Sequence, residues 1–187
     1  MCVVPIDGVT IRPLSPQRDE RGQLVELCRH VWVEPDVPVQ WNLVVNRSRV
    51  VRGVHWHELH VDYIAPVFGS LHAALVDLRP GSPTELESEL VELDADWPVL
   101  LTIPSGVGHG FYSERESAVL YAVTRYWDPD DEFGVRWDDP ELGIGWPEGV
   151  REATVSERDR AMPLLADAAP RAAWEPQPSA ARSSAIA

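Results

Sequence analysis

Short runs of β-branched and aromatic residues, separated by turns rich in glycine and proline, constrain the fold of this sequence most strongly. The runs lie at about 41–56, 61–79, 86–112 and 118–127. Short runs at this spacing are typical of an all-β sandwich or barrel. The 187 residues include 17 prolines and 12 glycines, which favour turns over a helical bundle. We therefore expect an all-β fold.

Several local signals refine this expectation. The run at 61–79 predicts two strands joined at Gly69, because glycine permits the turn. The run at 86–112 predicts two more strands, with breaks at "DADWP" and "PSG". Pro66 lies inside a run, which predicts either an edge strand or a bulge. Residues 18–32 fit a short helix and a strand about equally, and 155–169 form a second helix candidate. A few short helices are thus expected.

The chain is long enough for one domain with a sizeable core, and 44% of its residues are hydrophobic. We place that single domain at residues 1–167. From Ala168 the sequence is rich in alanine, proline and serine. Such a segment buries too little apolar area to offset the entropy of ordering, so residues 168–187 are expected to form a flexible tail.

The net charge of −14 argues against nucleic acid as a partner, because nucleic-acid binding needs a basic face. A negative net charge is still compatible with a local arginine pocket for a small anion. Arg47, Arg49 and Arg52 lie close together in the sequence and could form one. The two cysteines, Cys2 and Cys28, form neither a disulfide framework nor a zinc-finger spacing. With no signal peptide and no long apolar run, we expect a cytoplasmic protein without a membrane segment.

A histidine cluster is the clearest candidate for chemistry. Alternate side chains of a strand share a face, so His55 and His57 would point the same way. Asp62 adds a carboxylate, and His109 follows a glycine-rich turn. Three imidazoles and a carboxylate suit Fe, Zn, Mn, Ni or Cu as a single divalent ion. We therefore predict a metal site made of His55, His57, Asp62 and His109.

The spacing of these residues resembles the two metal motifs of cupins. "HWHELHVDYIAPVFG" follows the pattern HxH, four residues, an acid, six residues, Gly, and "PSGVGH" follows PxGxxH. This sequence departs from the cupin pattern in having Asp62 for the usual glutamate and in lacking the glycine that begins each motif. A histidine on a strand can also serve only to satisfy a hydrogen bond, and we read His60 and His72 in that way, as surface residues.

A wider resemblance covers roughly residues 15–165. The collinear stretches are "RDERGQLVE", "VQWNLVVNRSRVVRGVHW", "VDLRPGSPT", "IPSGVGHGF", "LYAVTRYWDPDDEFGVRWDDPELGIGWP" and "VSERDRAMPLL". Together they resemble the dTDP-4-dehydrorhamnose 3,5-epimerase family, a branch of the cupins. The resemblance implies a cupin jelly-roll β-sandwich and a homodimer that exchanges strands. It also implies epimerisation at C3, C5 or both of a nucleotide-linked 4-keto-6-deoxy sugar, with dTDP as the expected nucleotide and without an organic cofactor.

The same resemblance assigns roles to individual residues. A proton beside the C4 ketone is removed by a base, and the enolate is reprotonated on the opposite face by an acid. The implied base is His55, held by Asp159, and the implied acid is Tyr121. Recognition of the nucleotide is carried over to Arg21, Gln40, Asn42 and Arg52, with Tyr126 or Trp127 stacking on the base.

Two positions depart from the family pattern. Where the family has a glutamine and a lysine, this chain has His57 and Asp62, and the loop between His55 and Gly69 is about three residues shorter. The family lysine helps to stabilise the enolate oxygen, which an ionised carboxylate cannot do. A bound cation acting as a Lewis acid is one substitute. Two alternatives therefore stand beside the epimerase: a metal-dependent cupin enzyme with another reaction, and a non-catalytic sugar-nucleotide binding protein.

Overall fold

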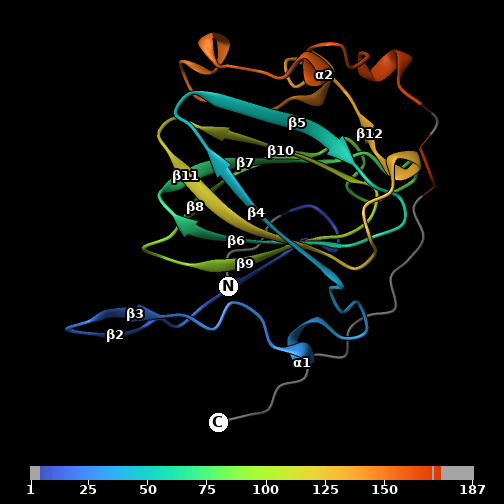
Figure 1. Ribbon diagram of the computed structural model, residues 1–187. Helices are drawn as coiled ribbons and strands as arrows, with labels where there is room; N and C mark the ends of the chain where they lie inside the picture. Colours follow the sequence, from blue (N-terminus) through green and yellow to red (C-terminus); the bar gives the residue numbers. More distant parts are fainter. Residues whose placement is uncertain (1–4, 170, 174–187) are drawn as a thin grey trace.

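Two five-stranded antiparallel sheets form the body of the molecule (Figure 1), and the computed structural model describes residues 5–169 and 171–173. The first sheet has the order β1-β9-β6-β11-β4, with β1 at Thr10–Pro13, β4 at Gln40–Asn46, β6 at Asp62–Phe68, β9 at Val99–Ile103 and β11 at Ser117–Val123. The second has the order β12-β5-β10-β7-β8, with β5 at Val50–Trp56, β7 at Ser70–Asp77, β8 at Ser88–Asp94, β10 at Val107–Ser113 and β12 at Phe133–Gly134. The predicted all-β class is confirmed.

Helical structure is short, as expected. Helix α1 spans His30–Val33, and α2 spans Glu157–Arg160. Ser156 caps α2, because its hydroxyl accepts a hydrogen bond from the backbone N–H of Asp159 at 3.0 Å. Single 3-10 turns lie at Pro129–Asp131, Pro140–Leu142, Val150–Glu152 and Leu165–Asp167. Within the described residues, no helix has the length and apolar character needed to cross a membrane.

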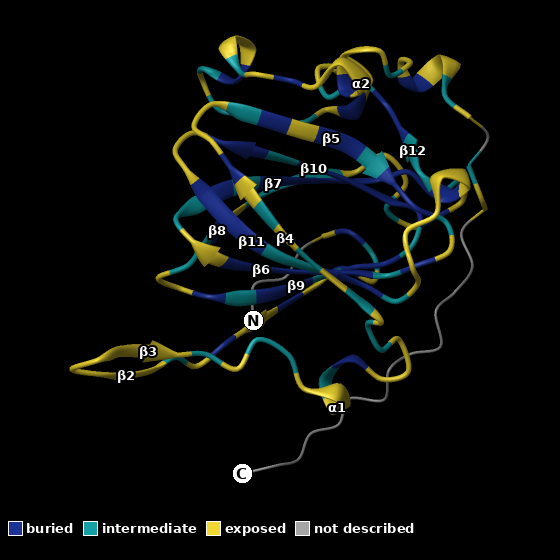
Figure 2. Cartoon of the chain, viewed as in Figure 1, coloured by how far each residue is buried: buried dark blue, intermediate teal, exposed yellow. Residues whose placement is uncertain are grey.

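The ambiguous segment 18–32 contains both kinds of structure. Strands β2 (Gln17–Asp19) and β3 (Gly22–Leu24) pair as a hairpin, and α1 follows it. This hairpin projects away from the two sheets (Figure 1), and all six of its strand residues are exposed, as the yellow ribbon in Figure 2 shows. Most of the predicted tail at 168–187 lies outside the described residues.

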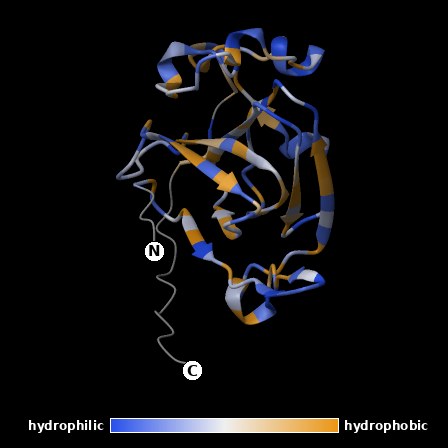
Figure 3. Ribbon diagram, turned by 90° about the vertical axis from the view of Figure 1, so that its left-hand side faces the viewer, coloured by the Kyte–Doolittle hydropathy of each residue, from blue (hydrophilic) through white to orange (hydrophobic). Residues whose placement is uncertain are grey.

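The core lies between and around the sheets. Buried side chains from β6, β7 and β9, among them Ile64, Leu75 and Leu101, pack together in its main cluster. A second cluster joins Val54 and Trp56 of β5 to the segments that follow β12. Figure 2 shows the dark blue of buried residues along the central strands, and Figure 3 shows orange, hydrophobic stretches on strands of the sheets. Apolar burial of this kind is the main force that holds the two sheets together.

Two details of the strand predictions needed the structure. Segment 86–112 forms β8, β9 and β10, so three strands replace the predicted two. Pro66 does not lie on an edge, because β6 has β9 on one side and β11 on the other. The pairing of β6 with β11 shifts its register next to Pro66, so the bulge alternative is correct. A bulge lets a residue without an N–H sit inside a sheet.

Candidate active site

A cavity of about 480 Å³ opens between the sheets. Strands β4 and β11 of the first sheet and β5 and β10 of the second line it, together with residues from 127–132 and 154–159. Its size falls in the range of ligand sites for small molecules. The predicted site residues that line it are Gln40, Asn42, Arg52, His55, His57, His109, Tyr121, Trp127 and Asp159.

His55 and Asp159 form a hydrogen-bonded pair at the wall of this cavity. His55 lies on β5, and its Nε2 donates to Asp159 Oδ1 at 2.8 Å. Helix α2 carries Asp159, whose other oxygen accepts the N–H of Gly53 at 3.2 Å. Burial alone would raise the pKa of Asp159, but the hydrogen bond and charge of His55 outweigh it, so the pKa is lowered. The carboxylate therefore stays ionised and fixes the imidazole.

Tyr121 faces the cavity from β11, in the opposite sheet to His55. Its hydroxyl donates to Asp62 Oδ1 at 2.7 Å. Burial and the Asp62 charge raise the pKa of Tyr121 well above its ordinary value. The phenol therefore keeps its proton at neutral pH. Val119 and Val123 line the same cavity, as expected for residues that alternate along one strand face with Tyr121.

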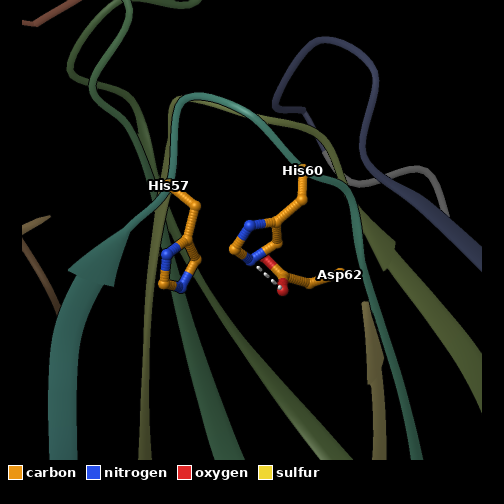
Figure 4. Close-up of side chains that lie close together, drawn as sticks. All are labelled: His57, His60 and Asp62. Carbon is orange, nitrogen blue, oxygen red and sulfur yellow. Dashed lines mark ion pairs between the residues drawn. The ribbon is translucent and has the colours of Figure 1, made fainter. Parts of the chain in front are cut away.

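His57, His60 and Asp62 meet where β5 passes into β6 (Figure 4). Each is buried, and one donor atom from each lies within 4.8 Å of the others. The prediction that His60 is a surface residue is wrong, because its side chain is buried. Its ring stacks on that of His57 with centroids 4.1 Å apart. His72, placed in the same class, is half-buried and stacks on Tyr112 instead.

The predicted four-residue metal set is not the group that the structure assembles. Among the described residues, the group whose possible ligand atoms all lie within 4.8 Å of one another contains His57, His60 and Asp62 but neither His55 nor His109. Nε2 of His55 is engaged by Asp159 instead. His109 Nδ1 lies 4.0 Å from Asp62 Oδ2, and burial lowers the pKa of His109 to about 4. The short connection after β5, and not the strand alternation, decides which histidine joins the group.

Two predicted nucleotide-binding residues lie apart from the cavity. Arg21 sits at the tip of the β2-β3 hairpin, where its side chain is 85% exposed and pairs with Asp19. Tyr126 is 75% exposed and does not line the cavity. Trp127, its neighbour, does line it, and its indole N–H donates to Glu132 Oε2 at 2.6 Å. Trp127 is therefore the better placed of the two candidates for stacking.

The comparison with known proteins places these residues in a family. A sequence model described as dTDP-4-dehydrorhamnose 3,5-epimerase matches residues 3–167. The chain belongs to this family. A dTDP-4-dehydrorhamnose 3,5-epimerase of Streptomyces griseus is 35% identical over 177 residues, which cover 84% of this chain and 87% of the relative.

Solved structures of related epimerases share the fold. A 3'-monoepimerase from Streptomyces bikiniensis, in complex with dTDP-quinovose, aligns with a TM-score of 0.82 and 29% identity, covering 89% of this chain and 88% of that one. An epimerase from Legionella pneumophila, in complex with dTDP-4-keto-L-rhamnose, aligns with a TM-score of 0.81 and 31% identity, covering 87% and 90%. Both the epimerase function and the cupin-like jelly roll implied by the sequence resemblance are confirmed.

Three residues at or behind the cavity wall of this dTDP-4-dehydrorhamnose 3,5-epimerase family member escaped the sequence analysis: Glu132 and Arg158 line the cavity, and Asp131 holds two of its histidines. Asp131 is buried and contacts both His57 and His60. Glu132 lies 4.0 Å from His55 Nδ1 and forms an ion pair with Arg158 at 2.8 Å. Burial would raise the pKa of Glu132, but Arg158 and the nearby histidines lower it. The acidic run "DPDDE" at residues 128–132 was the sequence signal for Asp131 and Glu132. Such a run of charges is more often a solvated surface.

Proposed function

We propose that this chain epimerises a dTDP-linked 4-keto-6-deoxy sugar at C3, C5 or both by enolisation. The observation that carries the proposal is the placement of His55, paired with Asp159, and Tyr121 on opposite sheets around one cavity. Inversion at a carbon needs a base on one face and an acid on the other, and this arrangement supplies both. The names of the epimerase relatives give the substrate class.

His55 suits the base. Its Nε2–H is committed to Asp159, so a neutral ring carries its lone pair on Nδ1. In the proposed step Nδ1 takes the proton from the carbon beside the C4 ketone, and the C–H electron pair moves into an enolate whose charge rests on the C4 oxygen. Asp159 then stabilises the imidazolium that forms, as carboxylates do in histidine-based catalytic pairs.

Tyr121 suits the acid, with one complication. Its raised pKa keeps the phenol protonated, so a proton is available for the opposite face of the enolate carbon. Giving up that proton leaves a phenolate beside the carboxylate of Asp62, 2.7 Å away. Two like charges at this distance repel strongly inside a protein. The reaction therefore needs a positive group near Asp62, at the place where the family resemblance leads one to expect a lysine.

Polar groups at the cavity rim support binding of the nucleotide part. Arg52 is held by Asn46, which accepts from its Nε at 2.8 Å, and an arginine fork suits a diphosphate. Gln40 and Asn42 of β4 share a hydrogen bond of 3.1 Å between their side chains. Trp127, whose backbone N–H is held by Gln40, offers a flat surface for the base.

A homodimer is part of the proposal. Strand β4 is an edge strand, and its outward face presents Trp41, Leu43 and Val45, each at least 48% exposed. Edge strands with apolar faces invite a second chain. The β2-β3 hairpin projects from the subunit and carries Arg21, so this arginine reaches a cavity only when a second copy is present. The expected cytoplasmic location belongs to the proposal as well.

Solvent exchange tests the proposal directly. In D2O with dTDP-4-keto-6-deoxyglucose, the wild-type protein is expected to incorporate deuterium at C3, C5 or both. Tyr121→Phe should still exchange a proton at the first centre but lose net inversion by about 10²–10⁴-fold, since it lacks the acid. Calorimetry with dTDP measures binding separately.

The contrary outcome is also informative. Wild-type protein that binds dTDP but gives no deuterium incorporation, with or without added metal, would refute the epimerase and favour a sugar-nucleotide binding protein. Mass spectrometry of the recovered nucleotide sugar reads the result at each carbon.

A further inference from the structure

Three buried side chains gather beside Tyr121 without an evident purpose in proton transfer. His57 and His60 come from the connection between β5 and β6, and Asp62 begins β6 (Figure 4). All three are at most 5% exposed. Burial of polar and charged groups costs free energy unless they are paired. The contacts of each donor atom therefore decide what the group is for.

Asp131 holds both imidazoles in the same manner. Its backbone carbonyl accepts from His57 Nδ1 at 2.9 Å, and its carboxylate lies 3.2 Å from His60 Nδ1. The carboxylate also accepts the backbone N–H groups of Glu58 and Leu59, which fixes the connection. A ring that donates from Nδ1 keeps its lone pair on Nε2. Carboxylates and carbonyls on the far nitrogen are the usual outer partners of metal-bound histidines.

The remaining nitrogen of His60 has no hydrogen-bond partner. His60 Nε2 is buried and lies 3.2 Å from Asp62 Oδ1, but the two atoms are not aligned for a hydrogen bond. A lone-pair nitrogen this close to a carboxylate oxygen is repelled unless a proton on that nitrogen or a metal ion lies between them. A metal ion bound to both atoms would satisfy the nitrogen and neutralise the carboxylate.

The sequence departs from its family at two of these three positions. His57 and Asp62 stand where the family resemblance leads one to expect glutamine and lysine. The change removes a cation from the cavity and adds two metal-ligand side chains at once. His55 and its partner Asp159 are untouched by it. A cation at this group would restore positive charge beside Tyr121 while leaving the base free.

We infer that His57, His60 and Asp62 bind one divalent transition-metal ion, such as zinc, cobalt, manganese, nickel or iron(II). Two imidazoles and one carboxylate are a known ligand set for these ions, with further positions open to water or substrate. The metal site lies at the proposed active site, and a role for the ion in catalysis rests on the proposed epimerase function. A bound ion would supply Lewis-acid polarisation of a ketone oxygen.

Binding requires a local adjustment of the two rings. Their planes differ by only 26° while their centroids lie 4.1 Å apart, so the two rings are stacked rather than arranged around a common point. Donor atoms within 4.8 Å of one another must approach to about 3.4 Å in a tetrahedral site with bonds of 2.0–2.1 Å. The rings therefore turn toward one another on binding, and their environment changes with them.

Metal binding is measured on the full chain without substrate. Tag-free protein is stripped with a chelator and titrated by calorimetry with zinc and with cobalt(II), and manganese, nickel and anaerobic iron(II) follow. One ion per chain is expected, with the visible absorption of a low-symmetry cobalt site and a rise in the thermal midpoint. His60→Gln and Asp62→Asn should each weaken binding at least about 100-fold, and Asp131→Asn, which removes an outer partner, about 10–100-fold.

Matched controls identify the site. His30→Gln removes an exposed histidine that pairs with Glu34 at 3.1 Å, and it should leave the stoichiometry and affinity unchanged. The double variant His57→Gln/Asp62→Lys, which restores the family residues, should fold but lose the ion. Circular dichroism and thermal unfolding establish that each variant is folded.

The outcomes separate this inference from the epimerase proposal. Absence of stoichiometric binding of all five ions to folded wild-type protein would overturn the site, as would binding that survives both His60→Gln and Asp62→Asn. In either case His60 is better described as an imidazolium between Asp62 and Asp131. Stoichiometric binding at this group without deuterium exchange in any metal form would leave the site standing and refute the epimerase.

Discussion

Asp62 accepts the hydroxyl hydrogen of Tyr121 at 2.7 Å and lies 3.2 Å from His60, so one buried carboxylate contacts two groups of the cavity. Burial would raise the pKa of Asp62, but the neighbouring histidines outweigh it and the pKa is lowered. For His60, burial would lower the pKa, and the two carboxylates beside it raise it. At the scale of single residues, this chain has a histidine–carboxylate arrangement where the family resemblance leads one to expect a lysine.

Asp159 offers the sharpest test at this scale. Asp159→Asn should reduce the rate of deuterium exchange by about 10²–10⁴-fold, because the amide neither fixes the His55 ring nor stabilises its protonated form. The effect should fall on kcat and leave KM nearly unchanged, since Asp159 contacts His55. Steady-state kinetics measure both constants. Asp167→Asn, a change to an exposed carboxylate, is the control, and an equal loss in the control would contradict the assignment.

At the scale of elements, the turn between β6 and β7 carries the chain from one sheet to the other. Gly69 occupies it with a φ of +63°, and a Cβ added there would lie 2.5 Å from the carbonyl oxygen of Glu116. A residue with a side chain is strained in this backbone region and also meets fixed backbone. The turn thereby requires glycine at the point where the two halves of the sandwich join.

Gly69→Ala is therefore expected to lower the free energy of unfolding by about 1–3 kcal/mol. Gly81→Ala is the matched control, because Gly81 also has a positive φ, of +82°, but no atom lies within 4 Å of its added Cβ. The control should cost about 1 kcal/mol, from the backbone conformation alone. Urea denaturation gives both values, and equal losses would show that contact with Glu116 is unimportant.

The end of β7 contains a buried ion pair that anchors the following loop. Asp77 accepts from Arg79 at 2.8 Å and from the hydroxyls of Ser82 and Thr84. Burial would raise the pKa of Asp77, but these bonds outweigh it and the pKa is lowered. Arg79 also donates to the carbonyl of Asp7 at 2.7 Å, which ties the start of the chain to this loop.

Asp77→Asn should destabilise the fold by about 3–5 kcal/mol, because it leaves Arg79 buried without its counter-charge. Asp138→Asn, in a half-exposed pair with Arg136, should cost no more than about 1 kcal/mol. The folded pKa of Asp77 lies below its ordinary value of 3.8, so the stabilisation is present above that pH and is lost as the pH falls through the folded pKa. Denaturation at pH 7 and below pH 3.8 should show the difference from wild type narrowing in acid.

At the scale of the whole molecule, the apolar outer face of β4 and the projecting hairpin bear on the proposed dimer. Trp41, Leu43 and Val45 alternate along β4 with Gln40, Asn42 and Val44, which line the cavity. One strand thus presents the substrate cavity on one face and a candidate dimer surface on the other. Assembly and substrate binding are then expected to depend on the same strand.

Leu43→Glu is expected to shift the protein from dimer to monomer, because it places a charge in the middle of the proposed interface. Light scattering coupled to gel filtration reports the mass in solution. The monomer should also bind dTDP more weakly, since Arg21 of a second copy no longer reaches the cavity. Trp97→Glu changes a side chain that is 77% exposed in the β8–β9 turn and should leave the dimer intact. A monomeric wild type would refute the proposed assembly.

The sequence by itself predicted the class of fold, the family and the pairing of His55 with Asp159. Strand periodicity depends on local alternation, so β6, β7 and β11 were found within a few residues, and the single run at 41–56 covers β4 and β5. The long collinear stretches gave His55, Tyr121 and Asp159 their proposed roles. In the structure, all three residues line one cavity.

Only the tertiary structure decided which histidines meet. His55 and His57 lie two residues apart, yet His55 turns to Asp159, 104 positions later, and His57 turns to Asp131 and His60. Alternation along a strand predicts a shared face, but it does not predict which distant hydrogen-bond partner holds each ring. Asp131 and His60 were missed for the same reason: their significance lies in buried contacts between segments about 70 residues apart, which the chain makes only when its sheets pack.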